Sequence, residues 1–567
     1  MNATQEELKI MQSSKFYNIT TILLAGFLFR IFLLKYHWVV GFDEVHYLRL
    51  GLSAAQNGFS ELLHPYWPPT YPILIALFSN FFSDGELAAR LVNIVSSLVS
   101  VFLIYALAKK AFSEKIALLA ALTFTFFPPL AFDATNVLAE TVYTTFGLAS
   151  ILSGWIALNK RSFMHAILVG VFSAFAYLAK PEGIYYVMVF AGISAIVFLI
   201  RIKQMQKNLL AITALSLVGF LIFSLPYLLY VKSEMGMWSL SMKFQVNQQF
   251  AALAYAKDKS PEARFSLTED NRYLPTDVAY HDGNFQVLVD QSTSGGQEKK
   301  VDIGLGLFIK KYVENFFKVN REGIPVVLTF APFLLVALGL FGREWNTEQT
   351  RFNVYILMFV LFWWLVAMPM FHVNLRYFTP QLPLLFIWLA NGLYILKEVV
   401  SNSIKNNDKY VPDWMLGKSQ FVAGTLVAIL LLGFSYIPEM GKILKRNKHD
   451  NDYWAEAVEL KTAGEWLKAN TNGPFRIMSE NKAVDYYAGI LDTRNTVSFP
   501  INKNFNRILA YAQFKDVDYL VVTDRYKSKF TNLQFLTDKQ VPYNELKLVY
   551  ENKNPAGIKT VIYKLIP

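Results

Sequence analysis

The sequence predicts a polytopic α-helical membrane protein with about eleven transmembrane helices, followed by a small C-terminal α/β domain. Composition is the first observation: 54% of the 567 residues are hydrophobic and only 17% are charged, whereas soluble domains average about 25% charged residues. The second is the recurrence of apolar runs long enough to cross a bilayer as far as residue 437. The third is that no such run occurs after residue 437, where short helical and β-rich patterns alternate.

The apolar runs predict the transmembrane segments. Most are about 17 to 25 residues long, which suits a hydrocarbon core of about 30 Å. We expect spans at Tyr17–Leu34, Leu87–Leu107, Ile116–Leu130, Leu138–Leu158, Ala166–Leu178, Ile184–Ile200, Leu209–Val231, Ile324–Phe341, Val354–Met370, Tyr377–Leu396 and Phe421–Ile437.

Basic residues lie mainly in alternate loops between these runs. They are Lys109, Lys110, Lys115, Lys160, Arg161, Arg201, Lys203, Lys207, Arg343, Arg351, Lys397, Lys405, Lys409 and Lys418. The positive-inside rule assigns these loops to the cytoplasm. The N-terminus is then cytoplasmic, and the C-terminal domain is extracytoplasmic, or periplasmic at a plasma (inner) membrane. The net charge of +11 therefore reflects topology, and no nucleic acid partner is expected.

Two domains and two long outer loops follow from this division. The transmembrane domain covers residues 1–437, with outer loops at 36–86 and 232–323, and the extracytoplasmic domain covers 438–567. In the latter we expect helices at Ala457–Leu467, Ala483–Tyr487 and Ile508–Gln513, and strands at Phe475–Met478, Tyr519–Val522, Leu546–Tyr550 and Lys559–Tyr563. Asn554-Pro555-Ala556-Gly557 is typical of a hairpin turn between the last two strands.

The outer loops contain apolar patterns typical of helices in the membrane interface. In the first loop, Val45, Leu48, Leu52 and Ala55 share one helical face, with Asp43 as the expected N-cap and a stop at Asn57-Gly58. Leu307–Phe317 has the same character in the second loop. Ser83-Asp84-Gly85-Glu86 resembles a capping box in which Ser83 caps the second span.

Charged and histidine side chains at the outer ends of the spans are the candidate site residues, because ionisable groups at membrane depth usually face a cavity or a partner. Interfacial snorkelling is the alternative, above all for Arg30 and Arg90. The set comprises Arg30, Arg90, Asp133, Glu140, Lys180, Glu182, His372 and Arg376, to which the adjacent carboxylates Asp43 and Glu44 of the first outer loop are added.

Metal chemistry is a weaker interpretation of the same region. His46, His64 and His372 all fall on the outer side, but no ligand spacing such as H-E-x-x-H is present. The chain has no cysteine, which excludes disulfides, thiolate metal sites and a catalytic thiol. No metal site is predicted.

Several short motifs follow one another along the chain: Asp43-Glu44 with Tyr47, Tyr66-Trp67-Pro68-Pro69, Tyr71-Pro72, Ala88-Ala89-Arg90-Leu91-Val92, Glu140, Lys180-Pro181-Glu182-Gly183 and Arg376-Tyr377 with Pro380 and Pro383. In this order they resemble glycosyltransferases of the membrane C-type fold that use polyprenyl-phosphate sugars. The nearest group would be family 39, the protein O-mannosyltransferases and lipid A aminoarabinose transferases. One departure is that Trp67 and Thr70 flank the paired prolines, where the aminoarabinose transferases carry a lysine.

The resemblance implies an inverting transfer to a hydroxyl acceptor on a glycan, lipid or protein at the outer face. Asp43 would be the base, with Glu44 beside it as the second catalytic carboxylate, and Lys180 and Arg376 would bind the leaving phosphate. The remaining implied substrate-binding residues are Tyr47, Arg90, Glu140, Glu182, His372 and Tyr377.

The implied partners are a polyprenyl-phosphate sugar donor, the hydroxyl acceptor and the lipid bilayer. No cofactor is expected, since two cationic side chains suffice to neutralise the phosphate, although a divalent metal is compatible with the fold. The rival interpretation is a secondary transporter or lipid flippase, for which inverted repeats and charges at mid-depth would be typical. A membrane scaffold is a third possibility, but it leaves the outer charges unexplained.

Overall fold

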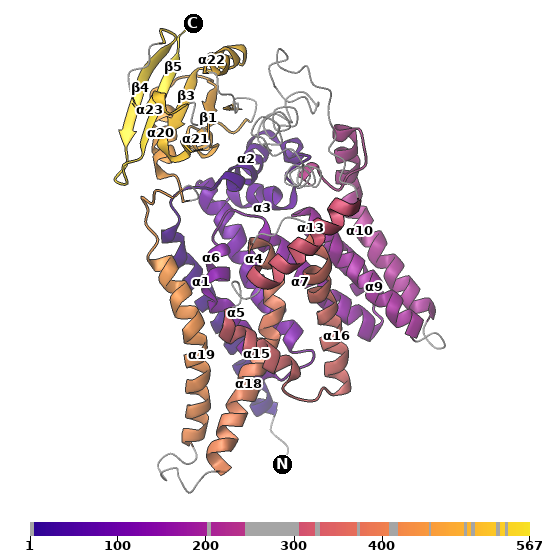
Figure 1. Cartoon of the computed structure of the whole chain (residues 1–567). Helices are drawn as coiled ribbons and strands as arrows, with labels where there is room; N and C mark the ends of the chain where they lie inside the picture. Colours follow the sequence, from indigo (N-terminus) through magenta and orange to yellow (C-terminus); the bar gives the residue numbers. More distant parts are fainter. Residues whose placement is uncertain are drawn as a thin grey trace.

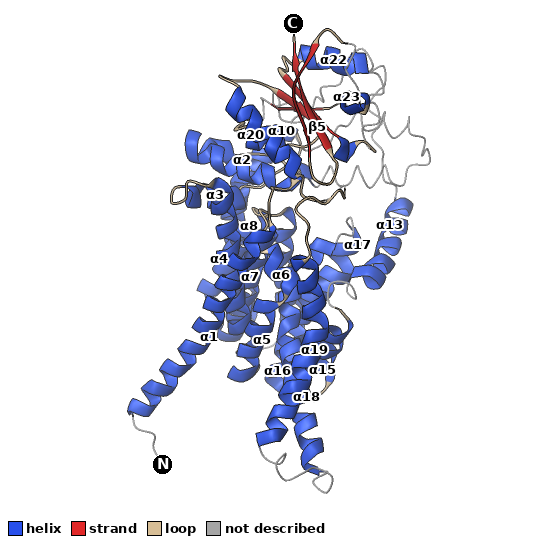
Figure 2. Cartoon of the chain, turned by 90° about the vertical axis from the view of Figure 1, so that its left-hand side faces the viewer, coloured by secondary structure: helices blue, strands red, loops and turns tan. Residues whose placement is uncertain are grey.

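The structure is a computed structural model that describes residues 5–200, 206–243, 305–323, 329–370, 375–406, 418–452, 455–492, 496–499, 505–528, 533–538 and 543–566. A bundle of long helices has a small sheet at one end, while the start of α1 lies at the opposite end (Figures 1 and 2). The predicted class, helices followed by an α/β region, is confirmed.

Every predicted span contains a helix. The bundle helices are α1 (Gln5–Leu33), α4 (Gly85–Ala108), α5 (Glu114–Phe126), α6 (Pro128–Asp133), α7 (Glu140–Lys160), α8 (Phe163–Tyr177), α9 (Ile184–Ile200), α10 (Gln206–Met235), α15 (Phe330–Phe341), α16 (Thr347–Phe362), α17 (Met368–Met370), α18 (Leu382–Asn406) and α19 (Lys418–Leu444). Among the described residues, 7 helical segments are long and apolar enough to cross a membrane. The other four predicted spans correspond to α5, α8, α15 and α19.

Two predicted spans differ from the observed helices at positions that contain proline, namely Pro128 in the third span and Pro380 and Pro383 in the tenth. The run Ile116–Leu130 is not one helix, because α5 ends at Phe126 and Pro128 starts the short α6. Proline lacks the N–H for a continuous helix and disfavours helical backbone in the residue before it. The span predicted from Tyr377 begins as a helix only at Leu382, after a 3-10 turn over Leu375–Phe378. Ile324, the predicted start of another span, lies outside the described residues.

The first outer loop forms α2 (Phe42–Asn57) and α3 (Thr70–Ser79), and its helix α2 ends where predicted, before Gly58. The expected N-cap is wrong: Gly41 occupies that position, and Glu44 accepts a hydrogen bond from the Gly41 N–H at 2.6 Å. Asp43 therefore lies inside the first turn, which leaves its carboxylate for other partners.

The predicted cap of the second span is also wrong. Asp84, not Ser83, caps α4, and its Oδ1 accepts from the N–H groups of Glu86 and Leu87 at 2.9 and 3.2 Å. Because the helix begins at Gly85, Asp84 is the residue next to its unpaired amide groups.

The amphipathic segment of the second outer loop forms α13 (Leu305–Lys318), as predicted for Leu307–Phe317. Leu305, Ile309, Val313 and Phe317, spaced four residues apart, are all exposed. On its other side Asn315 Nδ2 donates to the Pro369 carbonyl at 3.0 Å. This arrangement suits a helix at the membrane interface. The middle of that loop, residues 244–304, lies outside the described residues.

The C-terminal region is a mixed five-stranded sheet in the order β2-β1-β3-β5-β4. Its elements are α20 (Val458–Asn470), β1 (Ile477–Ser479), α21 (Ala483–Tyr487), β2 (Thr496–Ser498), α22 (Phe505–Phe514), β3 (Tyr519–Thr523), α23 (Phe535–Asp538), β4 (Leu546–Lys553) and β5 (Lys559–Leu565). The hairpin turn is confirmed, since the Gly557 N–H donates to the Asn554 carbonyl at 2.8 Å. The three-residue strand β2 was not predicted.

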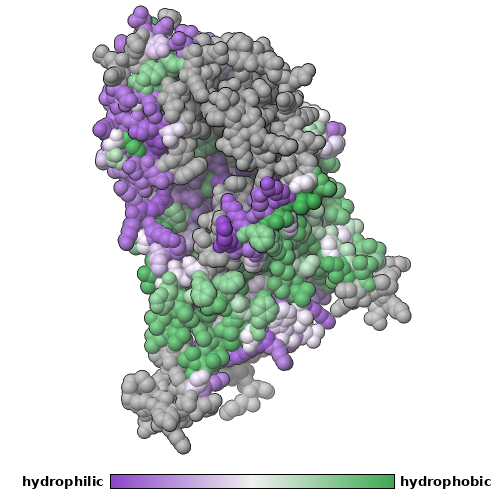
Figure 3. Space-filling model, viewed as in Figure 1, coloured by the Kyte–Doolittle hydropathy of each residue, from purple (hydrophilic) through white to green (hydrophobic). Residues whose placement is uncertain are grey.

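The surface separates the two regions by polarity. Hydrophobic residues dominate the helical bundle and hydrophilic ones cover the C-terminal domain (Figure 3). Exposed large apolar side chains such as Leu28, Phe102, Ile222 and Phe434 occur on the bundle helices. An apolar exterior of this kind is typical of a membrane-embedded bundle, and the chain is a multi-pass membrane protein.

Candidate active site

The candidate active site is a cluster of charged residues at the ends of helices that face the C-terminal domain. Asp43 comes from the first turn of α2, and Glu140 is the first residue of α7. Lys180 directly precedes a 3-10 turn, Pro181–Gly183, that leads into α9, and Arg376 lies in the 3-10 turn before α18. Proline and short turns at these helix ends bring together residues that are far apart in sequence.

The four side chains alternate in charge along a chain of contacts. Arg376 Nη2 lies 2.9 Å from Asp43 Oδ2, and Arg376 Nε lies 3.7 Å from Glu140 Oε1. The same Glu140 oxygen accepts a hydrogen bond from Lys180 Nζ at 2.9 Å. The structure therefore brings these four predicted site residues into one cluster.

The two ends of this cluster differ in exposure. The Lys180 and Glu140 side chains are 6% and 12% exposed, whereas those of Arg376 and Asp43 are 35% and 28% exposed. Burial lowers the pKa of Lys180, but Glu140 and Glu182 more than offset this and raise it above its ordinary value. Lys180 therefore stays charged, and the Arg376–Asp43 end is the one accessible to a ligand.

Tyr377 provides an aromatic face beside both cations. The Lys180 ammonium lies 4.7 Å and the Arg376 guanidinium carbon 5.4 Å from its ring centroid. Such cation–π contacts hold cations in place without neutralising them. Tyr377 thus belongs to the cluster, as predicted.

Asp133 is a further carboxylate beside this cluster to which the sequence assigned no role. It ends α6, and its side chain is hydrogen-bonded to Thr379. Burial and the charge of Glu140 raise its pKa to about 7, against the opposing effects of Thr379 and Arg376. A raised pKa favours the protonated carboxyl group, which both donates and accepts hydrogen bonds, and this suits contact with sugar hydroxyls.

Lys243 is a residue that sequence reasoning missed. Its ammonium lies 4.9 Å from the ring centroid of Trp67 and 5.4 Å from that of Tyr66, in the loop predicted to carry the paired prolines. One lysine in a long polar loop carries no periodic or motif signal, so only the tertiary fold reveals this position.

Glu44 and Arg90 contact the main chain in this structure. The Glu44 carboxylate accepts from the N–H groups of Gly41 and Val137, at 2.6 and 2.9 Å. Arg90 donates to the Thr135 carbonyl at 2.6 Å and pairs with Glu86 at 2.7 Å. These bonds hold the segments that carry Asp43 and Glu140, which favours positioning over direct contact with substrate.

Of the other predicted site residues, Tyr47 and Glu182 lie outside the chain of ion pairs from Asp43 to Lys180. Tyr47 is 3% exposed and packs edge-on against Trp67 and Tyr71. Glu182 acts electrostatically on Lys180, and its buried Oε2 has no hydrogen-bond partner. His372 lies outside the described residues.

The histidines of the first outer loop pack within the fold. His64 Nδ1 accepts from the N–H groups of Tyr66 and Trp67, and the His46 ring stacks on Trp67 at a centroid distance of 5.0 Å. Burial lowers the pKa of His64 to about 3. Within the described ranges, no three His, Asp or Glu side chains are grouped to hold a metal ion.

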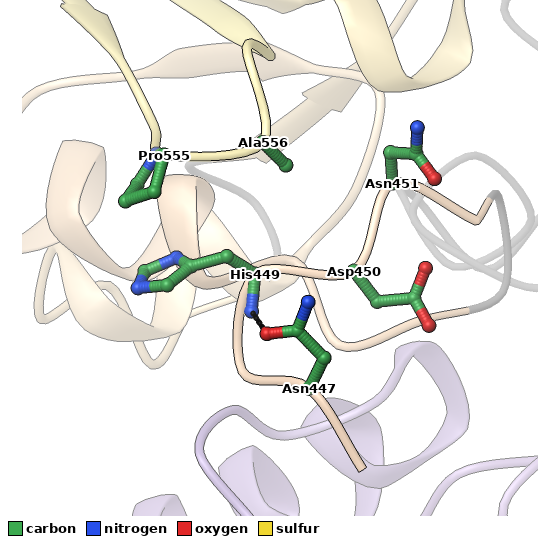
Figure 4. A pocket seen from close by; sticks show the side chains of 6 residues that line it. All are labelled: Asn447, His449, Asp450, Asn451, Pro555 and Ala556. Atoms are coloured by element: carbon green, nitrogen blue, oxygen red, sulfur yellow. Dashed lines mark hydrogen bonds between the residues drawn. The ribbon is translucent and has the colours of Figure 1, made fainter. Parts of the chain in front are cut away.

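A pocket of about 340 Å³ lies apart from the cluster and contains none of its residues. Figure 4 shows its lining, in which the segment after α19 faces the β4–β5 turn. The residues are Asn447, His449, Asp450, Asn451, Pro555 and Ala556.

Comparison with known proteins gives one family model that matches part of the chain and solved structures that share its fold. Residues 64–230 match the family described as dolichyl-phosphate-mannose-protein mannosyltransferase. The archaeal oligosaccharyltransferase AglB from Archaeoglobus fulgidus, in complex with an inhibitory peptide and a dolichol-phosphate, is similar with a TM-score of 0.57 and 13% identity, covering 96% of this chain and 74% of that one. ArnT from Cupriavidus metallidurans bound to undecaprenyl phosphate gives a TM-score of 0.54 and 13% identity, with coverage of 96% and 97%.

No curated protein matches the chain by sequence. The structural similarity extends over nearly the whole chain, whereas the family match covers the region from the paired prolines to α10. The chain is therefore a multi-pass membrane protein that shares the fold of AglB and ArnT over nearly its whole length, and its residues 64–230 match the family model of the dolichyl-phosphate-mannose-protein mannosyltransferases.

Proposed function

We propose that this protein is an inverting glycosyltransferase that moves a sugar from a polyprenyl-phosphate donor to a hydroxyl acceptor at the outer face of the plasma membrane. The observation that carries the proposal is the partly exposed Asp43–Arg376 pair next to the buried Glu140–Lys180 pair. It places a carboxylate base and two cations in one site, which is what attack on a phosphate-linked anomeric carbon needs.

In the proposed reaction Asp43 accepts the proton of the acceptor hydroxyl while that oxygen bonds to the anomeric carbon. The bond from this carbon to the phosphate oxygen breaks, and its electron pair leaves with the polyprenyl phosphate. Arg376 and Lys180 stabilise the charge that develops on the leaving phosphate. Asp133 and Glu182, at the border of the cluster, would bind sugar hydroxyls.

In this mechanism the Arg376 guanidinium can bind either the Asp43 carboxylate or the donor phosphate. Its Nη2 lies 2.9 Å from Oδ2 of the proposed base, Asp43. A donor phosphate competes for the same guanidinium, so binding of the donor would free Asp43 for proton transfer. The base is then released only when the leaving group is in place, which limits unproductive chemistry.

The lipid part of the donor is supported by the neighbours, since the similar AglB and ArnT structures hold a dolichol-phosphate and undecaprenyl phosphate. The acceptor would be a hydroxyl group of a glycan, lipid or protein. No metal is assigned a step, because two cationic side chains face the leaving group.

Reconstitution into liposomes tests the proposal against transport. Purified protein with a defined polyprenyl-phosphate sugar and a hydroxyl acceptor should release polyprenyl phosphate and form the glycoside, with and without EDTA. Movement of the intact donor across the bilayer without any glycoside would instead identify a flippase, and loss of transfer in EDTA would show metal dependence.

The proposed orientation is tested by cysteine labelling in this cysteine-free chain. Ser60→Cys and Asn472→Cys, at exposed positions of the outer loop and the C-terminal domain, should react with an impermeant maleimide in intact cells. Asn406→Cys, at the end of α18, should react only after permeabilisation. Labelling of Asn406→Cys in intact cells would reverse the topology and place the cluster in the cytoplasm.

A further inference from the structure

Four consecutive amide groups lead into the helix that carries Asp43, and side chains satisfy all of them. The N–H groups of Trp38 and Val39 donate to Glu456 Oε2, at 2.5 and 2.9 Å. The Val40 N–H donates to the Tyr487 hydroxyl at 3.1 Å, and the Gly41 N–H donates to Glu44. Three of the four acceptor contacts thus come from the chain after α19.

This segment has no regular structure that would fix it otherwise. It lies between the 3-10 turn Leu34–Tyr36 and the start of α2 at Phe42, and Val39 and Val40 are each only 2% exposed. Buried N–H groups require an acceptor, so the acceptors determine the path of the backbone. Asp43 follows two residues after Gly41, and its position therefore depends on that path.

Glu456 is itself held from two sides. Its Oε1 lies 2.7 Å from Arg446 Nη2 and 3.3 Å from His37 Nδ1, and its side chain is 14% exposed. Lys461 Nζ donates to the Trp38 carbonyl at 3.3 Å. A carboxylate held by two side chains presents its second oxygen to Trp38 and Val39 in a fixed direction.

Tyr487, the last residue of α21, connects the same segment to the other half of the cluster. Its hydroxyl accepts from Val40 and donates to Glu86 Oε2 at 3.1 Å. Glu86 pairs with Arg90, and Arg90 donates to the Thr135 carbonyl in the connection that leads to Glu140. One tyrosine thus touches the supports of both Asp43 and Glu140.

We propose that Glu456 and Tyr487 are positioning residues that set the place of Asp43, so that the C-terminal domain is part of the catalytic apparatus. This inference rests on the proposed function, because it assumes that Asp43 is the base. Neither residue touches substrate: they act through the backbone of residues 38–41 and, for Tyr487, through Glu86.

The test uses the full-length protein reconstituted with a polyprenyl-phosphate sugar, with rates normalised to folded protein. Tyr487→Phe removes only the hydroxyl, and Glu456→Gln puts a donor where two amides or Arg446 need an acceptor. Each should lower kcat about 10- to 100-fold with little change in KM for the donor, because misplacing a reacting group costs rate more than binding. The matched control is Tyr563→Phe, which removes a buried hydroxyl bonded to the Leu536 carbonyl within the same domain. It should leave kcat unchanged.

A double variant distinguishes positioning from stability. In an Asp43→Asn background, Tyr487→Phe should cost no further rate, since the base it positions is gone. Unchanged kcat in both single variants, or an additive loss in the double variant, would overturn the inference. Full activity of Asp43→Asn alone would instead contradict the proposed function, so the two failures are distinguishable.

Discussion

Asp43→Asn is expected to lower the rate of sugar transfer by about 100-fold or more, the loss typical of removing a general base. Asparagine keeps the size of the side chain and one acceptor oxygen, but it has no negative charge and cannot take up the acceptor proton. Since Asp43 is neither the N-cap of α2 nor fully buried, the change should have little effect on folding. Initial rates with saturating donor, compared with the amount of folded protein, measure the effect.

The same experiment needs a chemically identical control. Asp84→Asn makes the same change at an exposed residue that caps α4, a position where asparagine caps a helix about as well as aspartate. It should keep wild-type activity. A folded Asp43→Asn protein with near wild-type activity would rule out Asp43 as the base, and the base would then be sought at Glu140 or Asp133.

Arg376→Gln is expected to weaken use of the lipid-phosphate donor by about 10- to 100-fold, the range for loss of a charge-assisted hydrogen bond. Its side chain is 35% exposed and that of its partner Asp43 is 28% exposed, so little stability should be lost. The KM for donor and the affinity for free polyprenyl phosphate should change together. Arg343→Gln is the control, because it breaks an exposed ion pair with Glu398 away from the cluster.

Lys180→Met separates phosphate binding from structure at the other cation. Lys180 and Glu140 form a buried pair, and removing one partner of such a pair typically costs about 3–5 kcal/mol when the other charge is left unpaired; here Arg376 Nε still lies 3.7 Å from Glu140 Oε1, so we expect a smaller loss. Lys180→Met should therefore lower both donor use and thermal stability. Loss of stability with unchanged donor use per folded molecule would show that Lys180 is structural and that Arg376 alone binds the phosphate.

Parts of the fold were predictable because they depend on local chemistry. Apolar runs of bilayer length gave the positions of the helices, since each span must satisfy its own backbone hydrogen bonds in lipid. Most elements of the C-terminal domain were also predictable, because alternating apolar residues and the Asn554–Gly557 turn are local sequence signals of strands and a hairpin. The errors in the third and tenth spans both lie at prolines, where hydropathy indicates an apolar run but cannot show that the helix is interrupted.

The candidate site also has a part that the sequence predicts and a part that depends on the tertiary structure. Asp43, Glu140, Lys180 and Arg376 were predicted from sequence because ionisable groups at the ends of apolar spans are costly unless they have a partner or a function. Which of them pair, and that Glu44 and Arg90 bind the main chain, depends on contacts between residues far apart in the chain.

The sequence by itself determined the membrane class, the positions of the spans and the set of outer charges, because each follows from the free energy of placing a short segment in lipid or water. Only the tertiary structure decided the order of charges from Asp43 to Lys180, the position of Asp133 beside them and the support that Glu456 gives to Trp38 and Val39. Hydrogen bonds and ion pairs act over a few ångströms in space, and sequence separations of hundreds of residues carry no signal of them.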